Sequence, residues 1–182
     1  DDVHGWTKSI DNSYEALAHG THTIGIIAAE INNSIGIAGV NPNVKHIPIF
    51  TEDTATTYEG IEYAIKMGVK VINISFYLNA LQPSQISLKA MKLLQQANVM
   101  VVVASGNFGQ DNGHTPHGAG YPQSSKLENI VHVAASNSLG KLAYFTHYGK
   151  NHVHVAAPGE AIISTLPESS YGSMTGTSMA AP

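Results

Sequence analysis

A continuous apolar run, Val99-Met-Val-Val-Val-Ala104, most strongly limits the folds open to this chain. A strand without polar alternation is typical of a parallel sheet that is covered on both faces. A second β-rich run at 71–74 precedes it, and a helical apolar pattern, begun by Pro83 and Ser84, occupies 86–97 between the two. Strand, helix and strand with short connections predict right-handed βαβ units, and therefore an α/β fold with a mostly parallel sheet.

The flanking segments extend this pattern. Thr56 and Glu59 form a predicted capping box, and the helix that they begin ends at Gly68, a typical C-terminal glycine. A further buried helix is expected from His19, where an apolar stretch follows a polar, turn-rich start. Other short strands are expected at 46–50, 130–134, 152–156 and 162–165. With 182 residues and no internal repeat or linker, the chain is expected to form about one domain.

The composition excludes several functional classes. All nine basic residues are lysines, scattered among thirteen acidic residues, so the clustered Lys and Arg of a nucleic-acid interface are absent. No apolar run approaches the roughly 18 residues of a membrane segment, and no signal-peptide pattern is visible at the start. The absence of cysteine excludes disulfides, thiolate metal sites and a cysteine nucleophile within these residues.

Polar residues follow two of the predicted strands where each strand ends. Ser75 comes after the first, and Ser105-Gly106-Asn107 comes after the second. Ligands of parallel α/β sheets gather beyond the carboxyl ends of the strands. Helix starts near His19 and Ser178 are expected to face the same edge, which would bring a histidine, a serine and a carboxamide into one cleft.

The C-terminal stretch Gly176-Thr-Ser-Met-Ala-Ala-Pro182 places a hydroxyl between a flexible glycine and the apolar first turn of a buried helix. A serine at such a junction can be held exposed, facing the free N–H groups of the helix. Gly-Thr-Ser also suits ordinary helix capping. Taken alone, this stretch leaves both interpretations open.

Three blocks resemble, in their order along the chain, the subtilisin-like serine proteases, or subtilases: His19-Gly-Thr-His22, Ala104-Ser-Gly-Asn107 and Gly176-Thr-Ser-Met-Ala-Ala-Pro182. Weaker similarities fill the gaps, so the resemblance covers nearly the whole chain. It implies a three-layer subtilisin-like fold and a serine endopeptidase that hydrolyses peptide bonds through an acyl-enzyme intermediate. It also implies that Ser178 is the nucleophile, that His19 is the general base and acid, and that Asn107 donates to the oxyanion. His22 matches the structural second histidine of the family.

The resemblance leaves the catalytic aspartate unplaced. In the family this aspartate ends a strand upstream of the histidine block and is followed by Ser, Thr or Gly and then Gly; Asp1, Asp2 and Asp11 do not fit this pattern. The chain is therefore expected to be a partial catalytic domain, 1–182, that lacks the aspartate strand upstream and part of the serine helix downstream. The isolated piece is expected to be inactive. The alternative hypothesis is a catalytically inactive subtilase-fold binding or structural module, against which the three matching site residues argue.

The resemblance also implies a primary specificity pocket, with walls and base formed by Ser75, Ala104, Ser105, Gly106 and Gly120. Phe108 at the rim, and the lack of a carboxylate at the mapped wall, imply a polypeptide substrate with an apolar or aromatic side chain at the primary specificity position. Phe76-Tyr77-Leu78 departs from the glycines that many relatives carry there. These bulky residues would narrow the substrate groove or shift its register.

The loop at 31–37 resembles a structural calcium loop of the family. The implied ligands are the backbone carbonyls of Ile31, Ile35 and Ile37 and the side-chain oxygen of Asn33, an oxygen-only set that suits calcium. A plain Asn/Ser/Gly turn is the alternative. No cofactor is expected for catalysis, because the ten histidines include no His-Glu-x-x-His pattern. The resemblance further implies a pro-region in the full-length protein and an extracellular or secretory-pathway location.

Overall fold

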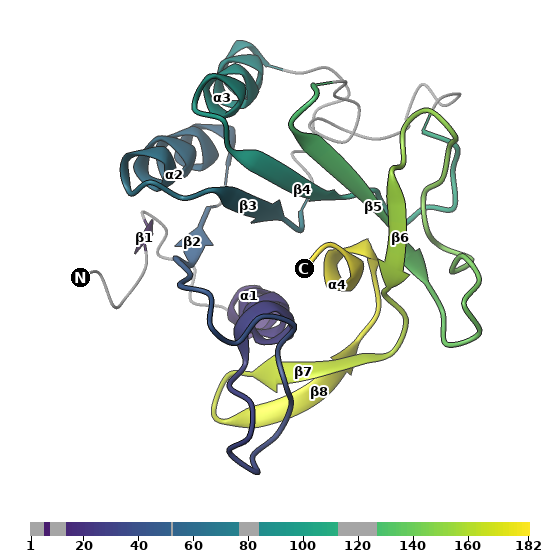
Figure 1. Ribbon diagram of the computed structural model, residues 1–182. Coiled ribbons are helices and arrows are strands. Elements are labelled where there is room, and N and C mark those ends of the chain that lie inside the picture. The colour runs from purple at the N-terminus through teal and green to yellow at the C-terminus, as the bar shows by residue number, and fades with distance from the viewer. Residues whose placement is uncertain (1–5, 8–13, 52, 77–83, 113–126) are drawn as a thin grey trace.

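A computed structural model describes residues 6–7, 14–51, 53–76, 84–112 and 127–182 (Figure 1). Its central feature is a parallel sheet with the strand order β3-β4-β5-β6. The four strands are β3 (Val71–Ile74), β4 (Met100–Ala104), β5 (Ile130–Ser136) and β6 (Val155–Pro158). Asn73 pairs with Val102, and Val103 pairs with His132. The predicted α/β fold with a mostly parallel sheet is confirmed.

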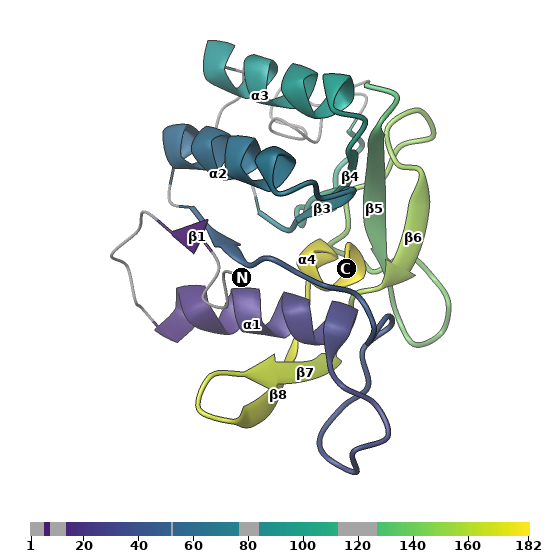
Figure 2. The same ribbon diagram turned by 60° about the vertical axis from the view of Figure 1, so that its left-hand side comes forward.

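Helices cover both faces of this sheet (Figures 1 and 2). The helices of the described residues are α1 (Tyr14–Ala28), α2 (Thr54–Lys66), α3 (Gln85–Gln96) and α4 (Thr177–Ala180). On one face, α2 and α3 bury Ile61 and Leu94 against Ile74, Val101 and Val103. On the other face, α4 packs against β5, and α1 lies beside α4. None of the helices in these ranges has the length and hydropathy that crossing a membrane requires.

Two helix starts differ from the prediction. α1 begins at Tyr14, so His19 lies in its second turn and not at its start. Leu and Ala are good helix formers and Glu15 suits the first turn, so the polar stretch before His19 is itself helical. α2 is capped by Asp53 and not by Thr56, because the carboxylate Oδ1 of Asp53 accepts from Thr56 N at 2.7 Å. Thr56 Oγ1 completes this capping box by accepting from Asp53 N at 3.1 Å.

Two other helix signals are confirmed. Ser84 caps α3, since its side chain accepts a hydrogen bond from Ser87 N at 3.0 Å. Gly68 follows the last residues of α2 with φ of 78°, the left-handed conformation that ends many helices. The capping serine and the glycine were therefore sufficient to locate the start of α3 and the end of α2 from the sequence.

Within the described residues, four further strands form two small sheets outside the central one. They are β1 (Trp6–Thr7), which is parallel to β2 (Ile49–Phe50), and β7 (Ile162–Leu166), which forms an antiparallel hairpin with β8 (Ser170–Met174). The sequence predicted β7 but not β8. The turn residues Glu168 and Ser169 take φ of 60° and 55°, as a tight hairpin requires, yet neither is the usual Gly or Asn.

The hairpin lies under α1 (Figure 2). The His22 side chain joins the two. The His22 side chain is fully buried, and its Nε2 lies 3.0 Å from the carbonyl oxygen of Ile162 and 3.2 Å from that of Gly172. Carbonyl oxygens can only accept, so Nε2 carries the proton. His22 is thus a structural histidine that ties α1 to both strands of the hairpin.

Gly25 allows α1 to approach β7 closely. Ser164 Oγ donates to the carbonyl of His22 at 2.8 Å, and a methyl group at Gly25 would collide with the hydroxyls of Ser164 and Thr165. We therefore expect Gly25→Ala to lower the free energy of unfolding by about 1–3 kcal/mol, measured by urea denaturation.

Gly20→Ala is the matched control, because it lies in the same helix and a methyl group there would meet nothing within 4 Å. Helix propensity alone then predicts a gain of up to about 1 kcal/mol. Equal effects of the two substitutions would contradict this packing of α1 on the hairpin.

Candidate active site

Ser178 lies in the first turn of α4. This helix is on the face of the sheet opposite α2 and α3 (Figure 1). The N-cap of α4 is Gly176, so neither Thr177 nor Ser178 is the capping residue of this helix. The capping interpretation of the Gly-Thr-Ser stretch is therefore wrong. Instead, the hydroxyls of Thr177 and Ser178 both bond to residues distant in the sequence.

The Ser178 hydroxyl bonds to the end of β3. Ser178 Oγ donates to the carbonyl oxygen of Ser75 at 2.9 Å, and Ser75 Oγ donates to the carbonyl oxygen of Ser178 at 3.0 Å. Ser75 is buried, whereas Ser178 is half-buried. The two serines thus hold α4 against the carboxyl end of the parallel sheet, the edge at which a ligand site is expected.

Asn107 bonds to the residue before Ser178. Its side-chain Oδ1 accepts from Thr177 N and from Thr177 Oγ1, both at 2.8 Å. A backbone N–H can only donate, so the atom that faces Thr177 must be the oxygen and not the Nδ2. The acceptor end of the carboxamide is therefore anchored on α4, and its Nδ2 end lies beside Gly176.

His19 lies half-buried on α1, the helix beside α4. Burial, with a smaller contribution from His22, lowers the pKa of His19 below its ordinary value. The ring is consequently neutral near pH 7 and can accept a proton. Among the described residues, no hydrogen bond joins this ring to Ser178 or to a carboxylate. Such bonds are often long or misaligned until a substrate is bound.

The residues predicted to form the pocket wall at the end of β4 do lie beside α4. Gly106 N donates to Thr177 Oγ1 at 3.1 Å, and Ala104 belongs to the apolar cluster that contains Ala180. Ala104, Ser105 and Gly106 are all buried. Gly120 and the Tyr77-Leu78 pair lie outside the described residues.

Phe108 and His147 form the outer part of this region. The Phe108 side chain is 71% exposed, which fits its predicted position at a rim, and its ring centroid lies 5.9 Å from that of His147. His147 is buried, and this burial lowers its pKa. Its carbonyl accepts from Ser105 Oγ at 3.3 Å. No sequence motif indicated His147, because its place here depends on a loop that returns from β5.

The loop at 31–37 contains an oxygen-rich turn. Asn32, Ser34 and Gly36 all take φ of 61°, and Asn33 Oδ1 accepts from Ile35 N at 3.0 Å. Glu30 Oε2 lies 3.5 Å from Asn33 Nδ2, which places a carboxylate next to the predicted ligands. An amide oxygen keeps a second lone pair, so this donor set fits a hard cation such as calcium.

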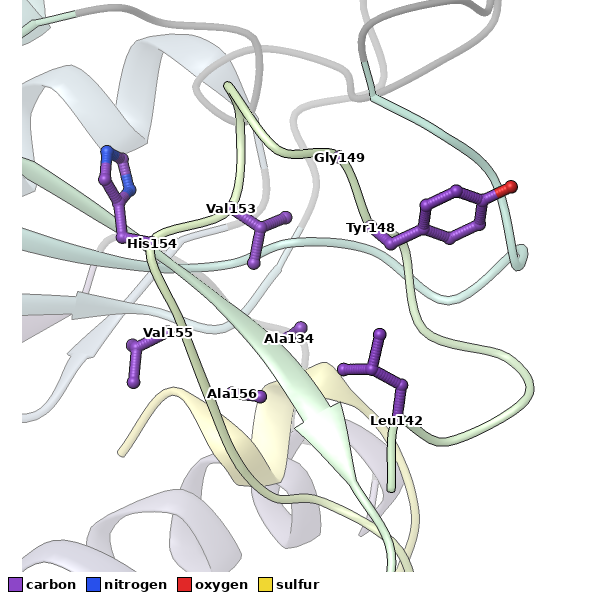
Figure 3. A pocket seen from close by; sticks show the side chains of 8 residues that line it. All are labelled: Ala134, Leu142, Tyr148, Gly149, Val153, His154, Val155 and Ala156. Atoms are coloured by element: carbon purple, nitrogen blue, oxygen red, sulfur yellow. The ribbon is translucent and has the colours of Figure 1, made fainter. Parts of the chain in front are cut away.

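A separate cavity of about 260 Å³ lies between β5, β6 and the 142–149 segment (Figure 3). Leu142, Ala134 and Ala156 lie around its centre, while the Tyr148 and His154 rings lie on opposite sides. Its lining is mostly apolar and includes none of the predicted site residues. It is therefore distinct from the candidate active site.

Comparison with known proteins agrees with this geometry. The model of the subtilase family matches residues 1–182, the whole chain. The chain belongs to the subtilase family. This subtilase is 35% identical over 182 residues to the thermophilic serine proteinase of Bacillus sp. (strain AK1), covering 95% of this chain and 43% of that protein. It is also 35% identical over 170 residues to subtilisin DY of Bacillus licheniformis, covering 90% of this chain and 59% of that protein.

Among solved structures, the prenylagaramide maturation protease PagA superposes on this subtilase with a TM-score of 0.76. The two are 27% identical, and the match covers 91% of this chain and 60% of PagA. The predicted three-layer subtilisin-like fold is therefore confirmed. This subtilase spans less than two thirds of the length of each of these relatives.

Proposed function

We propose that this subtilase is a serine endopeptidase that hydrolyses peptide bonds in polypeptide substrates through an acyl-enzyme intermediate, with Ser178 as the nucleophile. The observation that carries the proposal is the arrangement around α4. Its first turn presents a half-buried serine hydroxyl directly after Thr177, on which the Asn107 carboxamide is anchored. The neutral His19 lies on the neighbouring helix.

Each of these groups has a role in the reaction. His19 takes the proton of Ser178 Oγ as the oxygen attacks the scissile carbonyl carbon, and the carbonyl π electrons move to its oxygen. Asn107 Nδ2 donates to that oxyanion, a contact that is strongest in the transition state. Collapse of the intermediate breaks the C–N bond, and His19 returns the proton to the leaving amine. Water then cleaves the Ser178 ester by the same steps.

The test is hydrolysis of dye-labelled casein by protein expressed from its complete coding sequence. We expect Ser178→Ala to abolish hydrolysis. Ser173→Ala, which changes an exposed serine in β8, is expected to leave it unchanged. Hydrolysis by the Ser178→Ala protein at the wild-type rate would contradict the proposal.

We further propose that the preferred substrates carry an apolar or aromatic side chain at the primary specificity position. The exposed ring of Phe108 supports this proposal because it offers apolar surface. Ala104 and Gly106 are buried and carry no carboxylate. A peptide-library cleavage profile is expected to show enrichment of Phe, Tyr, Leu or Met. A dominant preference for Lys or Arg would overturn it.

A structural calcium ion in the 31–37 loop is also proposed, held by the Asn33 side chain and the carbonyls of Ile31, Ile35 and Ile37. The proximity of Glu30 supports it. At free calcium about 100 times the dissociation constant, we expect EDTA to lower Tm by about 5–10 °C. Asn33→Ala should lower Tm in calcium and remove most of the EDTA effect. An unchanged Tm in EDTA would contradict the proposal.

Family membership supports two further proposals, an extracellular or secretory-pathway location and a pro-region in the full-length protein. Both are checked by expressing the complete coding sequence in its native host. We expect proteolytic activity in the medium or envelope fraction, and an N-terminus of the active species that lies downstream of the encoded one. Activity confined to the cytoplasm would contradict the proposed location.

A further inference from the structure

Asn73 is an unusual residue for its place in β3. Alternate strand residues share a face, so Asn73 and Ser75 lie on the α4 side of the sheet, whereas Ile74 faces α2 and α3. Asn is depleted in strands, and Asn73 Oδ1 is buried without a hydrogen-bond partner among the described residues. Stability alone would favour an apolar side chain here, because an unsatisfied buried acceptor is costly.

Asn73 begins a chain of hydrogen bonds that reaches Ser178. Its Nδ2 donates to Ser75 Oγ at 2.9 Å, and Ser75 Oγ donates to the carbonyl oxygen of Ser178 at 3.0 Å. The Ser178 carbonyl can only accept, so the Ser75 hydroxyl proton must point to it and the Ser75 lone pair must face Asn73. Asn73 thereby fixes which way the Ser75 hydroxyl points.

The return bond closes a ring between the two serines. Ser178 Oγ donates to the carbonyl of Ser75 at 2.9 Å. The hydroxyl of each serine is therefore bonded to the backbone carbonyl of the other. Any loss of the Ser75 hydroxyl bond would let the first turn of α4 shift relative to β3. A shift of the attacking oxygen by a fraction of an ångström is enough to slow a reaction that depends on alignment.

We propose that Asn73 is a positioning residue for the nucleophile, acting through the Ser75 hydroxyl. The inference rests on the proposed role of Ser178 and goes beyond it, because Asn73 is bonded to Ser75 and reaches Ser178 through that residue. Its loss should therefore lower kcat, which depends on the placement of Ser178 Oγ, and leave KM nearly unchanged.

The test measures two quantities on purified protein from the complete coding sequence. One is the second-order rate of Ser178 labelling by a fluorophosphonate, and the other is the kcat and KM for a peptide p-nitroanilide with Phe at the cleaved position. We expect Asn73→Ala to lower the labelling rate and kcat about threefold to tenfold, the effect of one lost hydrogen bond, with KM unchanged within about twofold. Asn73→Leu, which keeps the side-chain volume, is used if truncation impairs folding.

A double-mutant cycle identifies the route of the effect. If Asn73 acts through Ser75, Asn73→Ala should have little further effect in a Ser75→Ala protein. Independent losses that multiply in the double variant would overturn the proposal.

Asn129 supplies the matched control, because it directly precedes β5 and so lies at the amino ends of the strands, away from Ser178. Its Nδ2 donates to the carbonyl of Val99 at 2.8 Å, and its Oδ1 is also buried without a described partner. Asn129→Ala should therefore lower stability and leave the labelling rate unchanged. If Asn73→Ala slows labelling no more than Asn129→Ala does, the positioning role is wrong. Absence of labelling in the wild type would instead overturn the proposed role of Ser178, and this inference with it.

Discussion

His19→Ala is expected to lower kcat by about 10⁶-fold, the size of the loss when the base is removed from subtilisin. A serine hydroxyl is inert near neutral pH unless a base takes its proton. His19 lies on α1, the helix beside α4, and the other histidine of that helix, His22, is bonded to the hairpin. Its lowered pKa keeps the ring neutral and ready for that step. The measurement is kcat with a peptide p-nitroanilide at pH 8, on protein whose folding is verified by circular dichroism.

Two other histidines serve as controls for His19. His46→Ala changes an exposed histidine between α1 and β2 and should leave kcat unchanged. His22→Ala removes the buried ring that bonds to Ile162 and Gly172, so it should lower the free energy of unfolding by about 2–4 kcal/mol. The folded fraction of that variant should keep most of its kcat. A His19→Ala protein that retains more than about 1% of wild-type kcat would contradict the assignment of the base.

Asn107→Asp is expected to lower kcat by about 10²–10³-fold, while the fold is kept. The new carboxylate can still accept from Thr177 N and Thr177 Oγ1, the two bonds that anchor the side chain on α4. It replaces the Nδ2 donor by an oxygen, however, and so repels the developing oxyanion. The substitution thus separates the structural role of Asn107 from its catalytic role.

Asn107→Ala is the comparison variant, because it removes both roles and should lower stability as well as kcat. Steady-state kinetics and urea denaturation of both proteins give the two quantities. A kcat of Asn107→Asp within threefold of the wild-type value would contradict the oxyanion role.

Much of the fold could be predicted because the decisive signals are local. The apolar run of β4, the Ser84 cap and Gly68 each report on a few neighbouring residues. The β8 strand was missed, since Glu168 and Ser169 adopt positive φ although neither is the Gly or Asn that usually indicates such a turn. The start of α1 was misplaced because a polar stretch with high helix propensity resembles a turn-rich segment.

The site was predictable as a set of residues but not as a set of contacts. The family motifs singled out Ser178, Asn107 and Ser75, which the fold does bring together. The bonds that join them link positions 70 and 103 residues apart, and nothing local encodes such pairings. The proposed role of Asn73 was likewise invisible, because its bond to Ser75 is local and only the bond from Ser75 to Ser178, 103 residues away, connects it to α4.

Labelling by a fluorophosphonate, followed by mass spectrometry of the modified peptide, tests the central claim most directly. The reagent forms a covalent bond only with a serine that an adjacent base activates. With protein from the complete coding sequence, we predict one modified residue, Ser178, and no labelling of the His19→Ala protein. Attachment at another serine, or no attachment while casein is still hydrolysed, would contradict the account.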